Sequence, residues 1–371
     1  MRRLRDEKDM SGCAISGIVS EAGVRFSGEA IMESIAVMHE RSSGLGGGFA
    51  GYGLYPENAD DYALHLMFDE PSAPKKVRAY LDRNWVIVRE EPIPTAHADN
   101  ISTPPVLRRC FVQPKPRMRD RLPAETDDDL MVKTALHINR FIDGAFVFSS
   151  GKNMGIFKGV GYPEDIGVFF RLDEYEAHLW LAHGRFPTNT TGWWGGAHPF
   201  GLLDWAVVHN GEISSYGINR RYLENFGYYC SLHTDTEVVT YLFDLLIRKQ
   251  ALPLEAACRV LAPPFWSEIA TMDARARMMA RTLRIVYGGA LLNGPFSILV
   301  GSTDGMVALN DRTKLRPMVA ARADDRLYIA SEEAAIRAVC PDPETLWHAE
   351  GGVPIVGEVK EGAHASLAHT A

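Results

Sequence analysis

The hydrophobic and polar positions of this chain follow two periods, one typical of strands and one of helices. Helical spacing of apolar residues predicts helices at 28–39 and 126–142, and a third that starts near Thr234. Short apolar runs between turn residues predict strands in both halves of the chain, at 14–19, 144–149, 153–158, 179–183, 205–208 and again after Pro295. The pattern is therefore strand-rich, with helices between the strands.

Two stretches interrupt this regularity. Residues 44–53 are rich in glycine, which predicts a flexible turn that leads into a strand. A GxGxxG between a strand and a helix is missing there, so phosphate binding is the weaker interpretation. Residues 89–126 are rich in proline and polar side chains, and they predict an insertion with irregular edges, within a span of about 57–150.

Composition narrows the functional classes. The 371 residues are 46% hydrophobic and 23% charged, with a net charge of -8, which favours an ordinary globular protein and argues against a nucleic-acid partner. No run of 18 apolar residues predicts a membrane span. The charged N-terminus lacks the apolar stretch of a secretory signal, so a cytoplasmic protein is expected. Five widely spaced cysteines without a CxxC pair argue against disulfides and against a zinc or iron-sulfur site in this chain.

Two motifs have a structural and a chemical interpretation. Asn210-Gly211, after an apolar run, is a hairpin signal, and 234–237 (Thr-Asp-Thr-Glu) is a capping box ahead of an amphipathic helix. Cys13 could likewise be a small buried thiol. Trp193 and Trp194 are more typical of packing or lid residues than of cofactor contacts. The four histidines at 178, 183, 198 and 209 lack the tight spacing of a metal site.

The chemical interpretation combines Cys13 with these segments. A thiol that attacks a carboxamide needs a base, donors for the oxyanion and charges that recognise the substrate. Removal of residues 1–12 would give Cys13 a free α-amine, which can act as that base. The Asn210 side chain and the Gly211 N–H could hold the oxyanion. Arg185 could grip an α-carboxylate and Asp235 an α-ammonium, which together would recognise glutamine.

Several ordered motifs resemble the class II glutamine amidotransferases, which are N-terminal-nucleophile hydrolases. The matching segments, which cover most of the chain outside the insertion, are 12–18 (Gly-Cys-Ala-Ile-Ser-Gly-Ile), 184–190 (Gly-Arg-Phe-Pro-Thr-Asn-Thr), 197–200 (Ala-His-Pro-Phe), 209–213 (His-Asn-Gly-Glu-Ile), 234–237, 294–296, Arg312, 316–317 and 331–332. The form of 185–190 with the following Trp-Trp is most similar to the glutamate-synthase branch. That branch includes the stand-alone subunits of archaeal-type glutamate synthase and N-methylglutamate synthase.

The resemblance implies a fold and a set of roles. The fold would be an α+β four-layer αββα sandwich formed by residues 13–371, with residues 1–12 as a propeptide. Cys13 would be the nucleophile, Asn210 and Gly211 the oxyanion hole, and the glutamine site would comprise Arg185, Phe186, Thr188, His198 and Asp235. The chain departs from the family pattern at Ala14, where glycine is usual, and at 40–42 (Glu-Arg-Ser), where the family has His-Arg-Gly.

The chain shows no signature of an ammonia acceptor site, and it is expected to bind no cofactor or metal itself. The resemblance implies a glutaminase subunit of a hetero-oligomer. Its ammonia would pass to a flavin-containing synthase subunit with FMN and iron-sulfur clusters, with a further glutamate-synthase-like subunit in some assemblies. The alternative is a catalytically silent regulatory or scaffolding subunit of such a complex. Glutaminase activity, and its loss in Cys13→Ala, discriminates the two.

Overall fold

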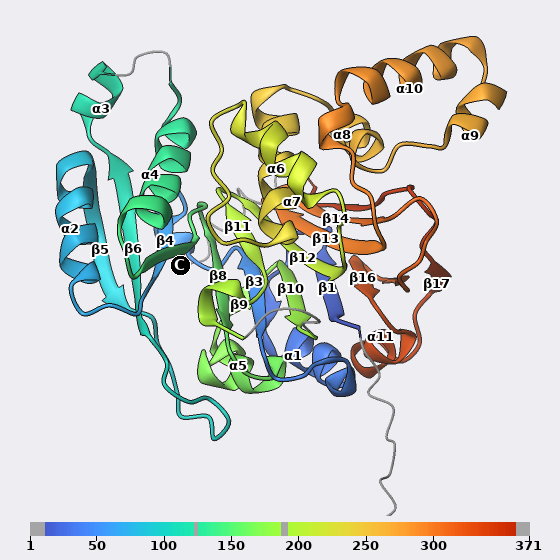
Figure 1. Cartoon of the computed structure of the whole chain (residues 1–371). Coiled ribbons are helices and arrows are strands. Elements are labelled where there is room, and N and C mark those ends of the chain that lie inside the picture. Colours follow the sequence, from blue (N-terminus) through green and yellow to red (C-terminus); the bar gives the residue numbers. More distant parts are fainter. Residues whose placement is uncertain (1–11, 122–124, 187–191, 361–371) are drawn as a thin grey trace, which may run out of the picture.

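Two antiparallel sheets packed face to face form the centre of the molecule (Figure 1). The computed structural model describes residues 12–121, 125–186 and 192–360. The first sheet has the order β17-β15-β16-β1-β10-β3-β8. Its strands are β1 Ala14–Ser20, β3 Gly47–Tyr52, β8 Met154–Gly159, β10 Leu179–Gly184, β15 Val319–Ala323, β16 Arg326–Ala330 and β17 Thr345–His348. The second sheet has the order β11-β12-β13-β14-β18, from β11 Phe200–Leu202, β12 Trp205–Gly211, β13 Phe296–Ser302, β14 Gly305–Asn310 and β18 Ile355–Glu358.

Helices cover the outer face of each sheet. Below the first sheet in Figure 1 lie α1 Glu29–Ala36, α5 Pro163–Phe169 and α11 Glu333–Val339. Above the second sheet lie α6 Tyr216–Glu224 and α7 Asp235–Phe243, which continues as a π-helical segment (η5 Asp244–Lys249), and then α8 Leu254–Leu261. Every residue of β1 is buried, since sheet and helix enclose it from both sides. The expected four-layer αββα sandwich is confirmed.

A smaller sheet stands beside this sandwich. Its order is β5-β6-β4-β7, from β4 Tyr62–Phe68, β5 Trp85–Pro92, β6 Val106–Pro114 and β7 Ala145–Ser149. The helices of this region are α2 Ala73–Asn84, α3 Pro116–Arg121 and α4 Asp127–Phe141. Thr126 and Asp129 exchange the two bonds of a capping box at the start of α4, each 3.2 Å long. Residues 89–126 are more regular than expected, because they include the end of β5, all of β6 and α3, and the loop that joins the two strands holds only three of the seven prolines.

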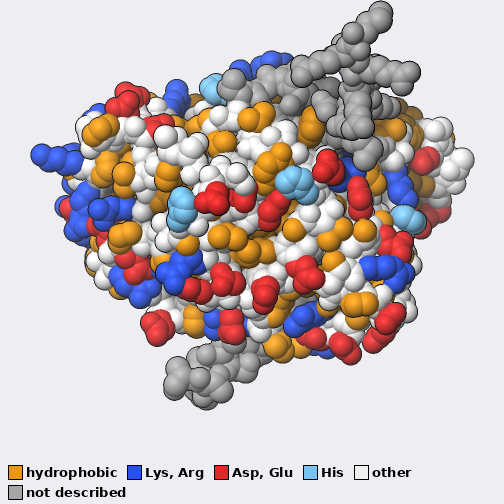
Figure 2. Space-filling model, turned by 90° about the horizontal axis from the view of Figure 1, so that it is seen from below, with side chains coloured by type: hydrophobic (Ala, Val, Ile, Leu, Met, Phe, Trp, Pro, Cys, Tyr) orange, Lys and Arg blue, Asp and Glu red, His pale blue; other side chains and the backbone are white. Residues whose placement is uncertain are grey.

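The remaining elements are short or peripheral. A two-stranded ribbon pairs β2 Phe26–Ser27 with β9 Glu176–Ala177, and single 3-10 turns occur at η1 His39–Arg41, η2 Pro56–Asn58, η3 Leu172–Glu174, η4 Trp194–Gly196 and η6 Gly288–Ala290. Helices α9 Trp266–Thr271 and α10 Ala274–Val286 project from the body beyond α8 (Figure 1). Seen from below, the surface mixes acidic, basic and hydrophobic side chains, and neither charge covers it (Figure 2). Within the described residues, no helix is both long and apolar enough to span a membrane.

Most of the glycine-rich stretch forms strand β3 inside the first sheet, which corrects the expected flexible turn. β3 pairs with β10 on one side and with β8 on the other, and Gly48 lies opposite both His183 and Lys158. A Cβ on Gly48 would lie 2.4 Å from the carbonyl oxygen of His198. Glycine is required here by close packing of the neighbouring backbone rather than by a turn.

Candidate active site

Cys13 lies at the N-terminal end of β1 in the first sheet, one residue before the strand begins. Its neighbour Ala14 pairs with Gly184, so the thiol reaches the residues that follow β10. The N–H of Phe186 donates to Cys13 Sγ over 3.4 Å, and Sγ lies 3.9 Å from the Phe186 carbonyl oxygen. The expected nucleophile and the expected glutamine-site residue Phe186 are therefore in contact.

Arg41 holds the backbone of Cys13 in place. Its Nε and Nη2 lie 3.3 and 3.2 Å from the Cys13 carbonyl oxygen, and its Nη1 pairs with Glu332 at 2.9 Å. A Cβ on Gly12 would lie 3.2 Å from Arg41 Nη2 and 3.9 Å from Arg316 Nη1. Two guanidinium groups thus flank the Gly12–Cys13 peptide bond, at the end of the expected propeptide.

The thiol is protonated at neutral pH in the unprocessed chain. Burial raises the pKa of Cys13, and the nearby charge of Asp235 raises it further. The hydrogen bond with Phe186 and the charges of Arg185 and Arg316 act in the opposite direction without reversing the shift. Among the described residues, the hydrogen-bond partners of Sγ are main-chain groups of Phe186. The chemistry therefore needs a base that the intact backbone at Cys13 does not supply.

Arg185 and Asp235 bring opposite charges to the thiol. Both interact electrostatically with Cys13 and with each other, although they come from different layers of the sandwich. Burial alone would raise the pKa of Asp235, but His209 and a 3.0 Å hydrogen bond from the Ile213 N–H outweigh it and lower the pKa to about 2. Asp235 is thus a carboxylate at any working pH. A cation and an anion beside a thiol fit the carboxylate and ammonium of a free amino acid.

Asp235 also opens helix α7, where the expected capping box is only half formed. The Thr234 hydroxyl accepts from the Thr236 N–H at 3.3 Å, which caps the helix. The Glu237 carboxylate instead accepts from the N–H groups of Ser231 and Leu232, both at 3.0 Å. This fixes the loop that approaches Asp235.

Asn210 and Gly211 end β12 in the second sheet. They pair with Ser297 and Phe296, so the hairpin turn expected at this Asn-Gly is wrong. Gly211 has φ +148°, and a Cβ there would lie 2.0 Å from the Pro295 carbonyl oxygen, so only glycine fits. The absence of a side chain at this position lets the end of β12 pack directly against the Pro295 backbone.

Ser331 connects Asn210 to the nucleophile strand. Its hydroxyl lies 3.5 Å from Asn210 Nδ2 and accepts from the Ile15 N–H at 3.1 Å. The amide is thereby positioned from a residue two places beyond Cys13. Asn210 is buried, and its Oδ1 has no hydrogen-bond partner within the described part of the chain.

His198 belongs to a buried row of histidines. His183 Nε2 lies 2.9 Å from the His209 carbonyl oxygen and 2.9 Å from His198 Nδ1. A carbonyl only accepts, so His183 Nε2 carries the proton and His198 Nδ1 accepts. Burial lowers the pKa of His183 to about 3 and that of His198 well below its usual value. Both rings are neutral, and the described residues contain no group of three ligating side chains suited to a metal.

A buried lysine was not anticipated from the sequence. Lys158 is 1% exposed, donates to the Gly195 carbonyl oxygen at 3.0 Å, and lies 4.1 Å from the centre of the Phe200 ring. Burial lowers its pKa to about 7, partly offset by the charge of Glu237. It anchors the segment that leads from Trp193 to His198. A single lysine within the otherwise apolar run 154–159 was the available signal.

The structure therefore brings together Cys13, Arg185, Phe186 and Asp235, and it links Asn210 to them through Ser331. Thr188 lies outside the described residues. Arg41 and Ser331 belong to segments already noted for the family pattern, but their contacts depend on the tertiary fold.

Part of the chain matches a known protein family. Residues 84–226 match the family described as "Glutamine amidotransferases class-II". An Archaeoglobus fulgidus protein described as uncharacterized is 49% identical over 95% of this chain and 94% of its own length. A putative glutamine amidotransferase of Methanothermobacter thermautotrophicus is 27% identical over 92% of this chain and 99% of its own length.

Two longer proteins match in part. The glutamate synthase [NADPH] large chain of Bacillus subtilis is 25% identical over 62% of this chain and 16% of its own length. Among solved structures, glutamine phosphoribosylpyrophosphate amidotransferase from B. subtilis has a TM-score of 0.46 at 14% identity, covering 93% of this chain and 47% of that one. The chain thus spans about half the length of that solved amidotransferase.

The chain carries a class II glutamine amidotransferase domain. Its activity is accordingly that of an enzyme which removes the amide nitrogen of glutamine.

Proposed function

We propose that Cys13 is the nucleophile of a glutaminase reaction and that it works as the N-terminal residue of a processed chain. The observation that carries this is that Arg185 and Asp235, of opposite charge, lie close enough to the Cys13 thiol for both to act on it electrostatically. In a processed chain the free α-amine of Cys13 accepts the thiol proton, which supplies the missing base. The N–H of Phe186, 3.4 Å from Sγ, then stabilises the thiolate.

The reaction follows in two stages. Sγ attacks the side-chain carboxamide carbon, and the carbonyl electron pair moves onto oxygen, where Asn210 Nδ2 and the Gly211 N–H stabilise it. The tetrahedral intermediate collapses, the C–N bond breaks, and the α-ammonium of Cys13 gives its proton to the leaving amine. Water, deprotonated by the same α-amine, attacks the thioester and releases glutamate and the thiol.

The remaining site residues hold the substrate. Arg185 binds the α-carboxylate of glutamine and Asp235 its α-ammonium. His198 and Thr188 complete the site, and His198 is held by its bond to His183.

We further propose that the released ammonia passes to a separate synthase subunit in a cytoplasmic hetero-oligomer. That partner would be of the glutamate synthase or N-methylglutamate synthase type and would hold FMN and iron-sulfur clusters. The likeness to a glutamate synthase large chain supports this.

An exposed face of α10 also supports a partner. Met278 and Ile285, one heptad apart, are 67% and 70% exposed, and Met279 and Val286 lie beside them. The opposite face packs inward through Ala280 and Leu283, so the helix is apolar on both sides. It carries four arginines and no carboxylate. This face therefore suits a synthase surface with an apolar centre and an acidic rim.

The first test measures ammonia and glutamate release by the purified protein beside Cys13→Ala, with the mature N-terminus read by mass spectrometry. Turnover on a chain that starts at Cys13, lost in the variant, is the expected result. Full activity of an unprocessed chain would overturn the α-amine mechanism. A processed chain that stays inactive even with a synthase subunit would favour the silent regulatory alternative.

A further inference from the structure

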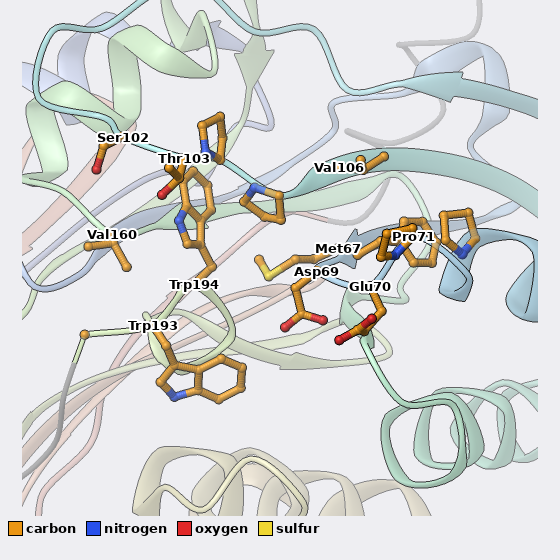
Figure 3. Close-up of a pocket in the computed structure, with 15 residues that line it drawn as sticks. Met67, Asp69, Glu70, Pro71, Ser102, Thr103, Val106, Val160, Trp193 and Trp194 are labelled. Atoms are coloured by element: carbon orange, nitrogen blue, oxygen red, sulfur yellow. The ribbon is translucent and has the colours of Figure 1, made fainter.

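A pocket outside the glutamine site lies between one edge of the small sheet and residues 192–194. Its volume is about 730 Å³. It lies between the end of β4, the start of α2, the loop before β6, and residues 192–194 (Figure 3). Neither Cys13 nor Arg185 lines it, so it is distinct from the site described above.

The lining has a consistent chemistry. Asp69 and Glu70 contribute two carboxylates from one side, and Trp193 and Trp194 contribute indole rings from the other (Figure 3). The described residues of the lining include no Lys, Arg or His, and both carboxylates lie exposed at the rim. Four prolines make the walls stiff, at 71, 74, 104 and 105.

The two indoles are held by packing. A Cβ on Gly159 would lie 2.5 Å from the Trp194 ring, and Phe169 meets the same ring edge to face at 5.8 Å between centroids. Phe146 meets the Trp193 ring at 5.2 Å. The aromatic wall is thus positioned before any ligand arrives.

The same wall continues into the glutamine site. Trp194 begins the turn η4, whose Gly195 carbonyl accepts the bond from buried Lys158. Ala197 and His198 follow directly, and His198 is bonded to His183. A ligand that pressed on the indoles would act on this short, internally bonded segment.

We propose that the pocket binds a small organic cation, an alkylammonium group seated against the indoles with its charge facing Asp69 and Glu70, and that occupancy changes the KM for glutamine. An indole face attracts an ammonium group, and the two exposed carboxylates attract its positive charge. The stiff apolar walls accept the alkyl part. The KM effect rests on the glutaminase function, whereas binding does not.

The experiment compares choline with 3,3-dimethyl-1-butanol, its uncharged analogue, as probes of the Cys13→Ala full-length protein. Tryptophan fluorescence and saturation-transfer NMR report binding, and a Trp193→Phe variant assigns the fluorescence change. Choline is expected to bind about tenfold more tightly than the neutral analogue. The double variant Asp69→Asn with Glu70→Gln is expected to remove that preference.

A matched control keeps the test specific. Glu57→Gln with Asp60→Asn removes two exposed carboxylates from the same region outside the pocket, and it should leave binding unchanged. Equal binding of both probes, no binding of choline at millimolar concentration, or unchanged affinity in the Asp69/Glu70 variant overturns the site. Binding in Cys13→Ala without any change in the KM of the active wild type overturns the link to the glutamine site. Because binding is measured without turnover, its failure is separable from a failure of the proposed glutaminase mechanism.

Discussion

The guanidinium of Arg41 bonds to the carbonyl oxygen of Cys13 and to the carboxylate of Glu332, so the residue before β1 is tied to the start of α11. The proposed nucleophile is thereby positioned by side chains to which the proposed mechanism gives no part in attack or substrate binding. Arg41 is the middle residue of the 40–42 segment that departs from the family pattern at both flanking positions. These contacts give Arg41 a role in fixing the backbone of Cys13.

Replacement of Arg41 by alanine is expected to lower kcat by about 100-fold with a smaller effect on KM, because a misplaced nucleophile affects the chemical step more than binding. Arg337→Ala is the control, since Arg337 forms only surface contacts near the same helix. Steady-state kinetics and the fraction of processed chain are measured together. An Arg41→Ala protein with wild-type kcat would show that the contacts of Arg41 with Cys13 and Glu332 serve the fold and not catalysis.

Gly211→Ala should abolish most activity and destabilise the fold by roughly 2–4 kcal/mol, because the added methyl meets the Pro295 carbonyl oxygen and φ is unfavourable. Gly288→Ala is the matched control, since its added Cβ meets nothing within 4 Å. Chemical denaturation and glutamine turnover provide the two measurements. Equal stability of the two variants would contradict the close approach at β12.

Asp235→Asn is expected to raise the KM for glutamine by about 100-fold, because the amide cannot pair with an α-ammonium. The pKa of Asp235 is lowered to about 2, so the carboxylate is charged from pH 5 to 8 and gives KM no pH dependence in that range. Its stabilising contribution is present above the unfolded pKa of about 4 and is lost as pH falls through about 2. A KM that rises steadily from pH 8 to pH 5 in the wild type, but not in Asp235→Asn, would contradict this assignment.

The sequence was informative where local pattern and chemistry coincide. The strands at 144–149, 153–158 and 179–183 are predicted by periodicity, and the helix predicted at 126–142 is confirmed as α4, which Thr126 caps. The glycines of β3 led to the wrong prediction of a flexible turn, because the groups packed against Gly48, from Lys158 and His198, come from distant segments. Local rules cannot detect a glycine that is required by such a neighbour.

For the candidate site, the sequence predicted the main residues but not the contacts that support them. Motifs predicted a site at Cys13, Arg185 and Asp235, and the structure places these residues near one another. The contacts of Arg41 with Glu332 and of Ser331 with Asn210 could not be predicted, because each joins residues more than 100 positions apart. The roles of Lys158 and Glu237 could not be predicted either. Both side chains matter because they are buried, and the sequence does not show burial.

The stability of this protein should have a minimum near neutral pH that depends on Lys158 and Glu237. Burial lowers the pKa of Lys158 to about 7, so between pH 7 and its unfolded pKa of about 10.4 the unfolded state binds more protons and stability rises with pH. Burial raises the pKa of Glu237 to about 7, so between about pH 4.3 and 7 the folded state binds more protons and stability falls as pH rises.

Each limb of this curve can be removed separately. Lys158→Met should abolish a gain of about 2 kcal/mol between pH 7 and 9, and Glu237→Gln should flatten the decline between pH 5 and 7. Urea denaturation at matched pH values measures both, with Lys152→Met as the control, because Lys152 lies near the surface close to the same strand. Parallel curves for wild type and Lys158→Met would show that the Lys158 ammonium stays charged in the folded protein. Its bond to Gly195 would then hold the 192–198 segment at every working pH.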